Sequence, residues 1–392
     1  MVDMIADPLD EQRKEFVQLA REFAEKEIAP YAAEWDRRKE FPREVIRRLG
    51  ELGFLGLLVS EDLGGLGLDA LTYLMMMEEI AAADASVAIT LSVHNSLPSY
   101  VLQRYGTPEQ HERWLKPMAR GELLAAFCVS EPDSGSDLAS VSTTATRTES
   151  TWVINGTKAW VTNGGVADVL LILVRTSKQA EKPSRGLSFF VVPADADGVQ
   201  ASKPEDKMGL RSSRTTQIVL DDVRLGADCL IGQEGMGFRY AMEGLDRGRL
   251  SVAAQAVGIA RAALDHARRY AAERKQFNKP IKDFQGVSFM LADMATRLAA
   301  ARSLVHDTAR AEERGEGITQ RASMAKLFAS ETAMFVANHA VQIFGGYGYM
   351  KDYPVERLLR DAKVTEIYEG TSEIQRVIIG RGLFSETDQR RG

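Results

Sequence analysis

Three long stretches in the second half of the chain contain no proline, and they constrain the fold more than any other feature. They run over residues 238–273, 284–313 and 318–343. Proline inside a helix removes a hydrogen bond and clashes with the preceding turn, so stretches of this length without it are typical of uninterrupted helices. Long helices bury their apolar faces by packing against one another. The sequence therefore predicts an antiparallel bundle in this part of the chain.

The remainder divides into a helical part and a β-rich part. Residues 1 to about 125 carry apolar side chains at helical spacing, and Thr107 to Gln110 has the pattern of a capping box. From about 126 to 235, short runs of β-branched and aromatic residues alternate with turn residues, which predicts strands. We expect an α+β chain that is mostly α, with domains at 1–125, 126–235 and 236–392.

Two local signals refine this division. Asp7 followed by Pro8 is suited to begin the first helix, because proline is favoured at the first helical position. The pair Asn155-Gly156 is typical of a tight turn between two strands. It follows the β-prone run 152–154, so we expect a hairpin that turns at Asn155 and Gly156.

Composition excludes several classes of protein. The net charge of −6 and the pI near 5.6 argue against a nucleic-acid-binding protein, whose binding surface would be basic. No apolar run reaches the roughly 18 residues of a membrane span, and the N-terminus lacks the features of a signal or transit peptide. Two cysteines, Cys128 and Cys229, exclude a disulfide framework. We expect a cytoplasmic protein, of bacterial type.

The segment from Ile367 to Gln375 places one carboxylate, Glu369, between an aromatic residue and a glycine, just before a predicted helix. Apolar and aromatic neighbours dehydrate a carboxylate, which raises its pKa toward the range of a general base. Thr371 and Ser372 are placed to cap a helix over 373–381. Taken alone, such a segment is more commonly a helix start with a surface acid.

Three further segments change that balance: Phe127–Asp137, Lys158–Gly165 and Gln342–Tyr349. Together with the Glu369 segment, in this order and spacing, they resemble the acyl-CoA dehydrogenases, and the likeness covers essentially the whole chain. The resemblance implies a helical N-terminal domain, a middle β-barrel domain and a C-terminal four-helix bundle. It also implies FAD in the cleft between the last two domains.

The resemblance further implies which residues hold the flavin. Those on the same subunit would be Phe127, Val129, Ser130, Ser136, Trp160, Val161, Thr162, Thr371, Ser372 and Glu373. Those contributed across a subunit interface would be Arg274, Phe277, Gln285, Gln342, Ile343, Phe344, Gly345 and Gly346. Such sharing implies a homotetramer, built as a dimer of dimers. Asn278 stands where the family usually has glycine, but asparagine tolerates a positive φ.

The implied substrate is an acyl-CoA thioester, with contacts from Ser136, Asp246, Arg249 and Gly370. Glu369 would take the α-proton, a hydride would pass from the β-carbon to FAD, and the product would be a trans-2-enoyl-CoA. An electron-transferring flavoprotein would then accept the electrons. One branch of the family, which includes isovaleryl-CoA dehydrogenase, carries its base on the bundle helix instead. The matching position here is Gly248, which has no side chain to act as a base.

Two functions of other classes stay open at this point. One is a related acyl-CoA oxidase or flavin monooxygenase, although oxidases of this kind usually carry a second C-terminal bundle, for which 392 residues leave no room. The other is a catalytically silent acyl-CoA-binding protein, which would not need an intact flavin-lining set. Chain length and pathway, fatty acid or branched-chain amino acid catabolism, also stay open. The layout is most similar to the short-chain, butyryl-preferring and branched short-chain members.

Three other signals favour structural interpretations. Gly65 to Ala70 fits a dinucleotide-binding fingerprint, but it lacks the strands that a Rossmann site requires, so we expect a surface loop. The five histidines stand far apart without ligand spacing, so we expect no metal site. Cys128 has no neighbouring base in the sequence and is expected to be a small buried residue in a strand.

Overall fold

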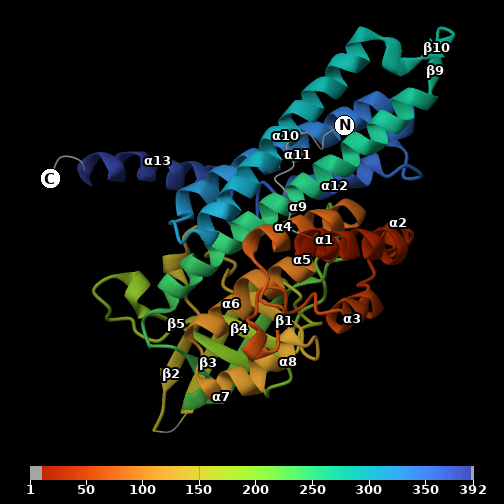
Figure 1. Ribbon diagram of the computed structural model, residues 1–392. Helices are drawn as coiled ribbons and strands as arrows, with labels where there is room; N and C mark the ends of the chain where they lie inside the picture. The colour runs from red at the N-terminus through yellow and green to blue at the C-terminus, as the bar shows by residue number, and fades with distance from the viewer. Residues whose placement is uncertain (1–10, 150, 390–392) are drawn as a thin grey trace.

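The computed structural model describes residues 11–149 and 151–389, so the predicted helix start at Asp7 lies outside the described residues. The elements follow the expected order, helical, then β, then helical (Figure 1). The N-terminal helices are α1 (Glu11–Phe23), α2 (Ala32–Arg38), α3 (Arg43–Glu51), α4 (Ala70–Ala83), α5 (Ala85–His94), α6 (Tyr100–Tyr105), α7 (Pro108–Gln110) and α8 (Lys116–Ala119). The capping box at the start of α7 is confirmed, with Thr107 and Gln110 satisfying each other's backbone N–H groups.

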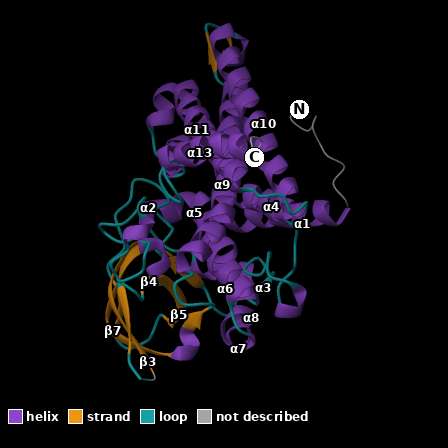
Figure 2. Cartoon of the chain, turned by 90° about the vertical axis from the view of Figure 1, so that its left-hand side faces the viewer, coloured by secondary structure: helices purple, strands orange, loops and turns teal. Residues whose placement is uncertain are grey.

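The strands of the middle domain gather at one end of the molecule (Figure 2). They are β1 (Ala125–Cys128), β2 (Thr144–Arg147), β3 (Thr151–Thr162), β4 (Val169–Arg175), β5 (Leu187–Pro193), β6 (Val199–Ala201), β7 (Thr215–Gly226) and β8 (Leu230–Ile231). Their order is β6-β7-β3-β2-β4-β5-β8, and β1 pairs in parallel with β4. Every residue of β1 is buried, as are Val169 to Val174 of β4, because this pair lies in the interior of the domain.

The hairpin predicted at Asn155 and Gly156 is wrong. Both residues lie inside β3, and the register of β3 against β7 shifts between Ile154 and Gly156. The Asn155 side chain donates to Asp222 Oδ1 at 2.9 Å and accepts from the Asp222 N–H at 2.8 Å. Gly156 is required because a Cβ there would lie 2.4 Å from Thr143 Oγ1. The two residues therefore form a bulge, with partners on other segments, and β3 pairs with β2 after a turn near residue 149.

The C-terminal helices confirm the predicted bundle. They are α9 (Gly237–Glu273), α10 (Gln285–Glu313), α11 (Thr319–Phe344), α12 (Val355–Val364) and α13 (Ser372–Gln389). A short ribbon, β9 (Lys275–Gln276) with β10 (Lys279–Pro280), joins α9 to α10. Figure 1 shows this ribbon at the end of the bundle farthest from the strands, and α13 extending away from the body.

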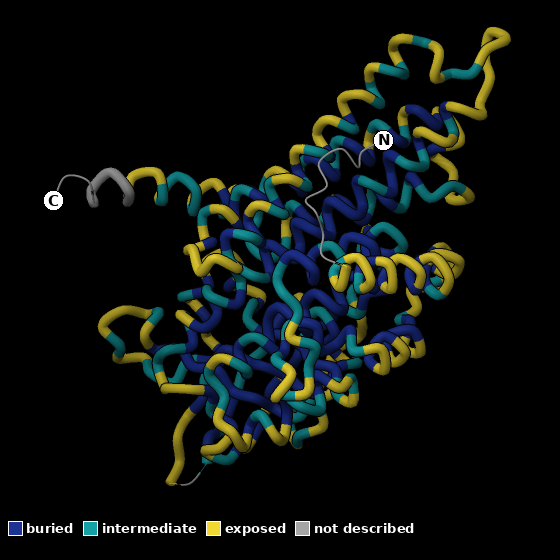
Figure 3. Tube along the Cα trace, in the orientation of Figure 1, coloured by how far each residue is buried: buried dark blue, intermediate teal, exposed yellow. Residues whose placement is uncertain are grey.

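Alanine allows the bundle helices to approach closely. On α11, Ala325, Ala329, Ala333 and Ala337 recur at every fourth position, and all are fully buried. Helix α11 packs against both α9 and α10, and α9 also packs against α4 and α5 of the N-terminal domain. The buried core therefore runs continuously along α9, whereas the outer surfaces of the ribbon and of the described part of α13 are largely exposed (Figure 3).

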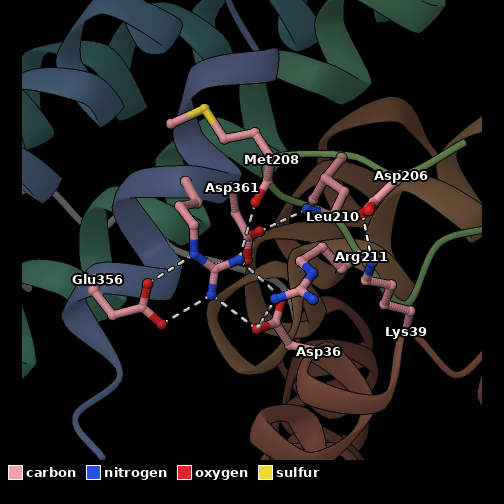
Figure 4. A network of polar contacts seen from close by, with 9 residues as sticks. Asp36, Lys39, Asp206, Met208, Leu210, Arg211, Glu356 and Asp361 are labelled. Carbon is pink, nitrogen blue, oxygen red and sulfur yellow. Dashed lines mark hydrogen bonds and ion pairs between the residues drawn. The ribbon is translucent and has the colours of Figure 1, made fainter. Parts of the chain in front are cut away.

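Arg360 of α12 makes contacts that join all three domains. Figure 4 shows its partners Asp36 and Met208 close to α12. Its guanidinium donates to both carboxylate oxygens of Asp36 in α2, at 3.0 and 2.8 Å, and to the Met208 carbonyl oxygen of the middle domain at 3.1 Å. The neighbouring Asp361 accepts from the Leu210 N–H at 2.7 Å. Helix α12 ends five residues before Glu369, so these contacts help to hold the segment that carries the predicted base in place.

Two of the weaker sequence signals, Gly65 to Ala70 and Cys128, have clear outcomes. Gly65 to Ala70 forms the loop before α4, and no strand precedes it in the part of the chain that the structure describes, so the dinucleotide interpretation is excluded. Cys128 is fully buried in β1, and burial raises the pKa of its thiol to about 12. No helix between residues 11 and 389 has the length and apolar character to cross a membrane. Those residues also contain no group of three or more potential metal ligands.

Candidate active site

Glu369 lies in the turn between α12 and α13, with its carboxylate pointing into the protein against α9. A Cβ built on Gly248 of α9 would lie 1.9 Å from Glu369 Oε2. Both carboxylate oxygens are buried and have no hydrogen-bond partner. Burial raises the pKa of Glu369 to about 7, although the positive charges of Arg249 and Lys326 act in the opposite direction. The expected dehydrated carboxylate is therefore present.

The backbone of this turn is held in an unusual conformation. Glu369 has a φ of 52° and Gly370 a φ of 92°, so two consecutive residues are left-handed. The Gly370 carbonyl oxygen accepts from Lys326 Nζ at 2.7 Å and from Gln375 Nε2 at 2.8 Å. Left-handed backbone is costly for a residue with a side chain and persists where its surroundings enforce it. Here these two donors hold the turn that directs Glu369 inward.

The cap of α13 differs in part from the prediction. The Thr371 hydroxyl accepts from the Ile374 N–H at 3.3 Å, which confirms Thr371 as a capping residue. Ser372 is not a cap but the first residue of the helix, and its buried hydroxyl has no partner. Glu373 is exposed in the first turn, where its backbone N–H and the Thr371 hydroxyl lower the pKa of its carboxyl group. The helix also continues to Gln389, beyond the predicted end at residue 381.

The predicted thioester contacts divide into two groups. Asp246 and Arg249 of α9 form an ion pair beside Gly248, and Thr319 donates to the second oxygen of Asp246 at 2.5 Å. Arg249 is 4% exposed, and its Nε has no partner. Arg249 lies near enough to Glu369 for its charge to act on the carboxylate, and Gly370 follows Glu369 in the chain. Ser136 is exposed on the loop that follows β1, in the middle domain.

The predicted flavin-lining segments lie side by side in the middle domain. The Ala159 N–H donates to the Ser130 carbonyl oxygen at 2.8 Å, and Lys158 Nζ donates to that of Val129 at 3.2 Å. Just beyond this contact, Trp160 adopts a φ of 58° and is 66% exposed, which is unusual for so large an apolar side chain. The exposed indole is therefore available to pack on a ligand.

The side chains of these two segments are not equally accessible. Val129, Ser130 and Thr162 are partly exposed. Phe127 stacks on Phe189 with ring centroids 5.1 Å apart, and Val161 is 1% exposed. Phe127 and Val161 therefore offer a ligand their backbone rather than their side chains.

The remaining predicted flavin residues form a separate group at the far end of the bundle. Arg274 lies with its guanidinium 5.5 Å from the centre of the Tyr347 ring, next to the end of α11. Phe277, on the ribbon, is 88% exposed, and Asn278 has a φ of 66°, as expected for a turn residue. Gln285 begins α10. In a single chain this group lies far from the strands (Figure 1).

The end of α11 presents backbone rather than side chains to this region. Ile343 and Phe344 are buried, and Phe344 stacks on Tyr270 with ring centroids 4.1 Å apart. Gln342 is exposed beside them. Gly345 has a φ of 60°, and a Cβ on Gly345 or Gly346 would meet nothing within 4 Å. This open backbone leaves room for a ligand or a second chain to approach closely.

Comparison with known proteins identifies this arrangement. Family models of the N-terminal, middle and C-terminal domains of acyl-CoA dehydrogenases match residues 10–122, 126–223 and 235–384. The chain belongs to the acyl-CoA dehydrogenase family. It is 46% identical to an acyl-CoA dehydrogenase of Bacillus subtilis over 94% of this chain and 97% of that one.

Solved structures agree with this assignment. Butyryl-CoA dehydrogenase from Megasphaera elsdenii superposes with a TM-score of 0.95 at 42% identity, covering 97% of this chain and 100% of that one. A chain from work on the electron-transferring flavoprotein of Acidaminococcus fermentans has the same TM-score and identity, and covers 97% of this chain and 99% of its own. This acyl-CoA dehydrogenase is thus an FAD-dependent oxidoreductase by family.

The acyl-CoA dehydrogenase also contains a cavity of about 260 Å³ that the sequence did not reveal. Its wall includes Tyr73 and Leu74 of α4, Tyr100 of α6 and Leu250 of α9, so it lies between the N-terminal domain and the bundle. An ion pair of Arg247 with Glu312, at 2.8 Å, forms part of its lining. Tyr73, in the cavity wall, also interacts electrostatically with Glu369.

The burial of two lysines, Lys158 and Lys326, was not predicted from the sequence. Lys158 of β3 is fully buried and pairs with Glu131 at 2.8 Å behind the flavin-lining segments. Burial raises the pKa of Glu131, but Lys158 and donors from residues 142 and 143 outweigh it and hold the pKa at about 2. Lys326 of α11 is the second. Lysine is normally exposed, so nothing in the local sequence distinguishes these two from surface residues.

Proposed function

We propose that this enzyme oxidises a short-chain acyl-CoA thioester to the trans-2-enoyl-CoA, with Glu369 as the base that removes the α-proton. The observation that carries the proposal is the buried Glu369 carboxylate, which has no partner for either oxygen. A base with a pKa of about 7 is ionised in about half of the molecules at neutral pH and accepts a proton readily. A carboxylate already engaged in an ion pair would be a weaker base.

The residues of the site fit FAD. Trp160 offers an exposed indole, Ser372 a buried hydroxyl without a partner, and Ser130 a partly exposed hydroxyl. Arg274 and the open backbone of Gly345 and Gly346 are suited to a pyrophosphate, although in this chain they lie at the far end of the bundle. When bound, FAD supplies the acceptor for the hydride of the substrate β-carbon. The chain's own part is to hold the thioester, direct Glu369 at the α-carbon and exclude water.

The test is the single change Glu369→Gln, which keeps the shape of the side chain but removes its basicity. In the FAD-loaded enzyme we expect flavin reduction by butyryl-CoA, followed by stopped-flow absorbance, to slow by at least the roughly 10²–10⁴-fold typical of general-base loss. Glu25→Gln is the control, because Glu25 is an exposed carboxylate of the N-terminal domain, outside the predicted flavin and substrate sets, and should leave the rate unchanged. Equal rates in Glu369→Gln and the parent enzyme would show that Glu369 is not the base.

The preference for a short chain is supported by the butyryl-CoA dehydrogenase of M. elsdenii, which is similar along its full length. Turnover with a panel of C4 to C16 thioesters and with isobutyryl and 2-methylbutyryl forms measures it. We expect the highest kcat/KM with a C4 or branched short-chain substrate. A maximum at C12 to C16 would contradict the proposal. The panel would also separate fatty acid from branched-chain amino acid catabolism.

We further propose an electron-transferring flavoprotein as the electron acceptor, supported by the similarity to a chain from work on that partner. Oxygen should be a poor acceptor, because bound product in a water-excluding site keeps oxygen from the reduced cofactor. Peroxide formation with butyryl-CoA should therefore be much slower than reduction of the flavoprotein. Comparable rates would instead identify an oxidase, the first of the alternative functions. The reaction would take place in the cytoplasm.

The exposed apolar residues support a homotetramer, built as a dimer of dimers. Phe277, Phe289 and Tyr349 are 88%, 63% and 87% exposed near the ribbon end of the bundle. Such a group of large apolar side chains marks an interaction surface more often than a free one. A second subunit there would bring its strands to Arg274 and would complete the flavin site. Sedimentation of a monomer with full FAD content would contradict the proposal.

A further inference from the structure

Lys326 is a buried cation close to the proposed base. Its side chain is fully buried in α11, and its Nζ donates to the Gly370 carbonyl oxygen at 2.7 Å. Among the described residues, this neutral oxygen is the one hydrogen-bond partner of Lys326 Nζ, and no carboxylate forms an ion pair with it. Removing an unpaired ammonium from water is costly, and burial accordingly lowers the pKa of Lys326 to about 8.

The groups around Glu369 come from four elements. Arg249 faces it from α9, Lys326 from α11 and the Tyr73 hydroxyl from α4, whereas Tyr368 precedes it in its own turn. Arg249 is already engaged by Asp246, so much of its charge is neutralised locally. Lys326 interacts electrostatically with Glu369 and Arg249. It also interacts with Glu366 and Glu373, which lie on either side of Glu369 in the chain. Of the two cations, Lys326 is therefore the one without a carboxylate in contact.

We propose that Lys326 is a positioning residue for Glu369, which both anchors the left-handed turn through the Gly370 carbonyl and supplies a positive charge, unpaired with any carboxylate, that favours the ionised form of Glu369. The proposal rests on Glu369 as the base. The two roles separate chemically, since anchoring requires only a hydrogen-bond donor whereas ionisation requires a charge. Neither Arg249 nor Gln375 can perform both roles. Arg249 is paired with Asp246, and Gln375, which also donates to the Gly370 carbonyl, carries no charge.

The charge has a predictable effect on pH dependence. A positive charge near a carboxylate favours its ionised form and commonly lowers its pKa by about 1–3 units. Removing the charge of Lys326 should therefore raise the pKa of Glu369, so that a smaller fraction is ionised at neutral pH. In a plot of the rate of α-proton removal against pH, the rise that reports ionisation of Glu369 would therefore move to higher pH by about one unit.

The experiment uses the FAD-loaded enzyme and the variants Lys326→Gln and Lys326→Met. Glutamine keeps a donor for the Gly370 carbonyl without the charge, and methionine removes both. We expect the acid limb of the pH profile for flavin reduction to move upward by about one unit in both variants. The limiting rate at high pH should be retained better by Lys326→Gln. Lys363→Gln is the control, because Lys363 is exposed on α12 and pairs with Glu366 at 2.7 Å.

A second measurement avoids turnover altogether. The protonated carboxyl band of Glu369, assigned in infrared spectra by its loss in Glu369→Gln, can be titrated in the parent and in Lys326→Gln. An unmoved band and an unmoved pH profile, with only a uniform loss of rate, would reduce Lys326 to a structural residue and overturn the proposal. If Glu369→Gln itself reduced flavin at the parent rate, Glu369 would not be the base, whereas the infrared titration would still report whether Lys326 controls its ionisation.

Discussion

A methyl group at position 248 should slow the chemistry while leaving the fold intact. The added Cβ would lie 1.9 Å from Glu369 Oε2 and 2.8 Å from the carboxyl carbon, both well inside the closest contacts that real Cβ atoms make. The carboxylate would have to retreat by roughly 1 Å, and a displacement of that size at a reacting centre costs on the order of 10²-fold. We therefore expect Gly248→Ala to slow flavin reduction by butyryl-CoA about 100-fold.

Stopped-flow bleaching of the FAD-loaded enzyme measures this rate, and α9 itself provides the control. Gly244 lies one turn earlier, and a Cβ there would be 3.6 Å from its nearest neighbour, an ordinary van der Waals contact. Gly244→Ala should therefore reduce flavin at the parent rate. If Gly248→Ala were as fast as Gly244→Ala, the Glu369 carboxylate would not occupy the volume in front of Gly248.

The same contact should appear in stability measurements. Alanine is favoured over glycine by about 0.8–1.0 kcal/mol in a helix interior, so Gly248→Ala should stabilise α9 wherever nothing opposes it. In the parent enzyme the clash with Glu369 opposes it, whereas in a Glu369→Ala background the methyl group has room. Urea unfolding of the four proteins in this double-mutant cycle should show the coupling. Equal effects of Gly248→Ala in both backgrounds would mean that the two residues do not touch.

Two further changes probe the buried acids. Burial, and the negative charge of Asp84, raise the pKa of Asp361 from 3.8 to about 7. The folded protein therefore holds this proton to higher pH than the unfolded chain does. Its stability should fall as the pH rises from about 4 to about 7. Asp361→Asn should flatten urea-unfolding stability between about pH 4 and 7; an unchanged curve would contradict this. Glu131→Gln leaves the Lys158 ammonium buried without a counter-charge and should cost about 3–5 kcal/mol of unfolding free energy, and parent-like stability would refute that role.

The sequence predicts the long helices well because their signal is repeated many times. The expected stretches 238–273, 284–313 and 318–343 differ from α9, α10 and α11 by at most one residue at either end. Each turn of these helices repeats the apolar pattern, so a single residue that departs from the pattern hardly changes the predicted extent of the helix. The burial of Glu369 was also predictable, because its aromatic and glycine neighbours adjoin it in the chain.

The errors arise where the deciding partner is distant in sequence. Asn155-Gly156 has the composition of a turn, but the side chain of Asn155 bonds to Asp222, 67 residues away. Lys326 finds its acceptor on Gly370, 44 residues away, and a single lysine on a helix carries no local sign of burial. Side chains with such partners are positioned by the tertiary fold, which cannot be predicted from the propensities of neighbouring residues in the sequence.

The contacts of Arg360 have a mechanical consequence for the whole enzyme. Helix α12, which leads to the turn of Glu369, is bound at Arg360 to Asp36 of the N-terminal domain and to Met208 of the middle domain. Three segments far apart in the sequence therefore set the position of one helix end. All three domains thus contribute to the position of the helix that precedes the base. We therefore expect a substitution at Asp36 to displace Glu369 although the residues around Glu369 are unchanged.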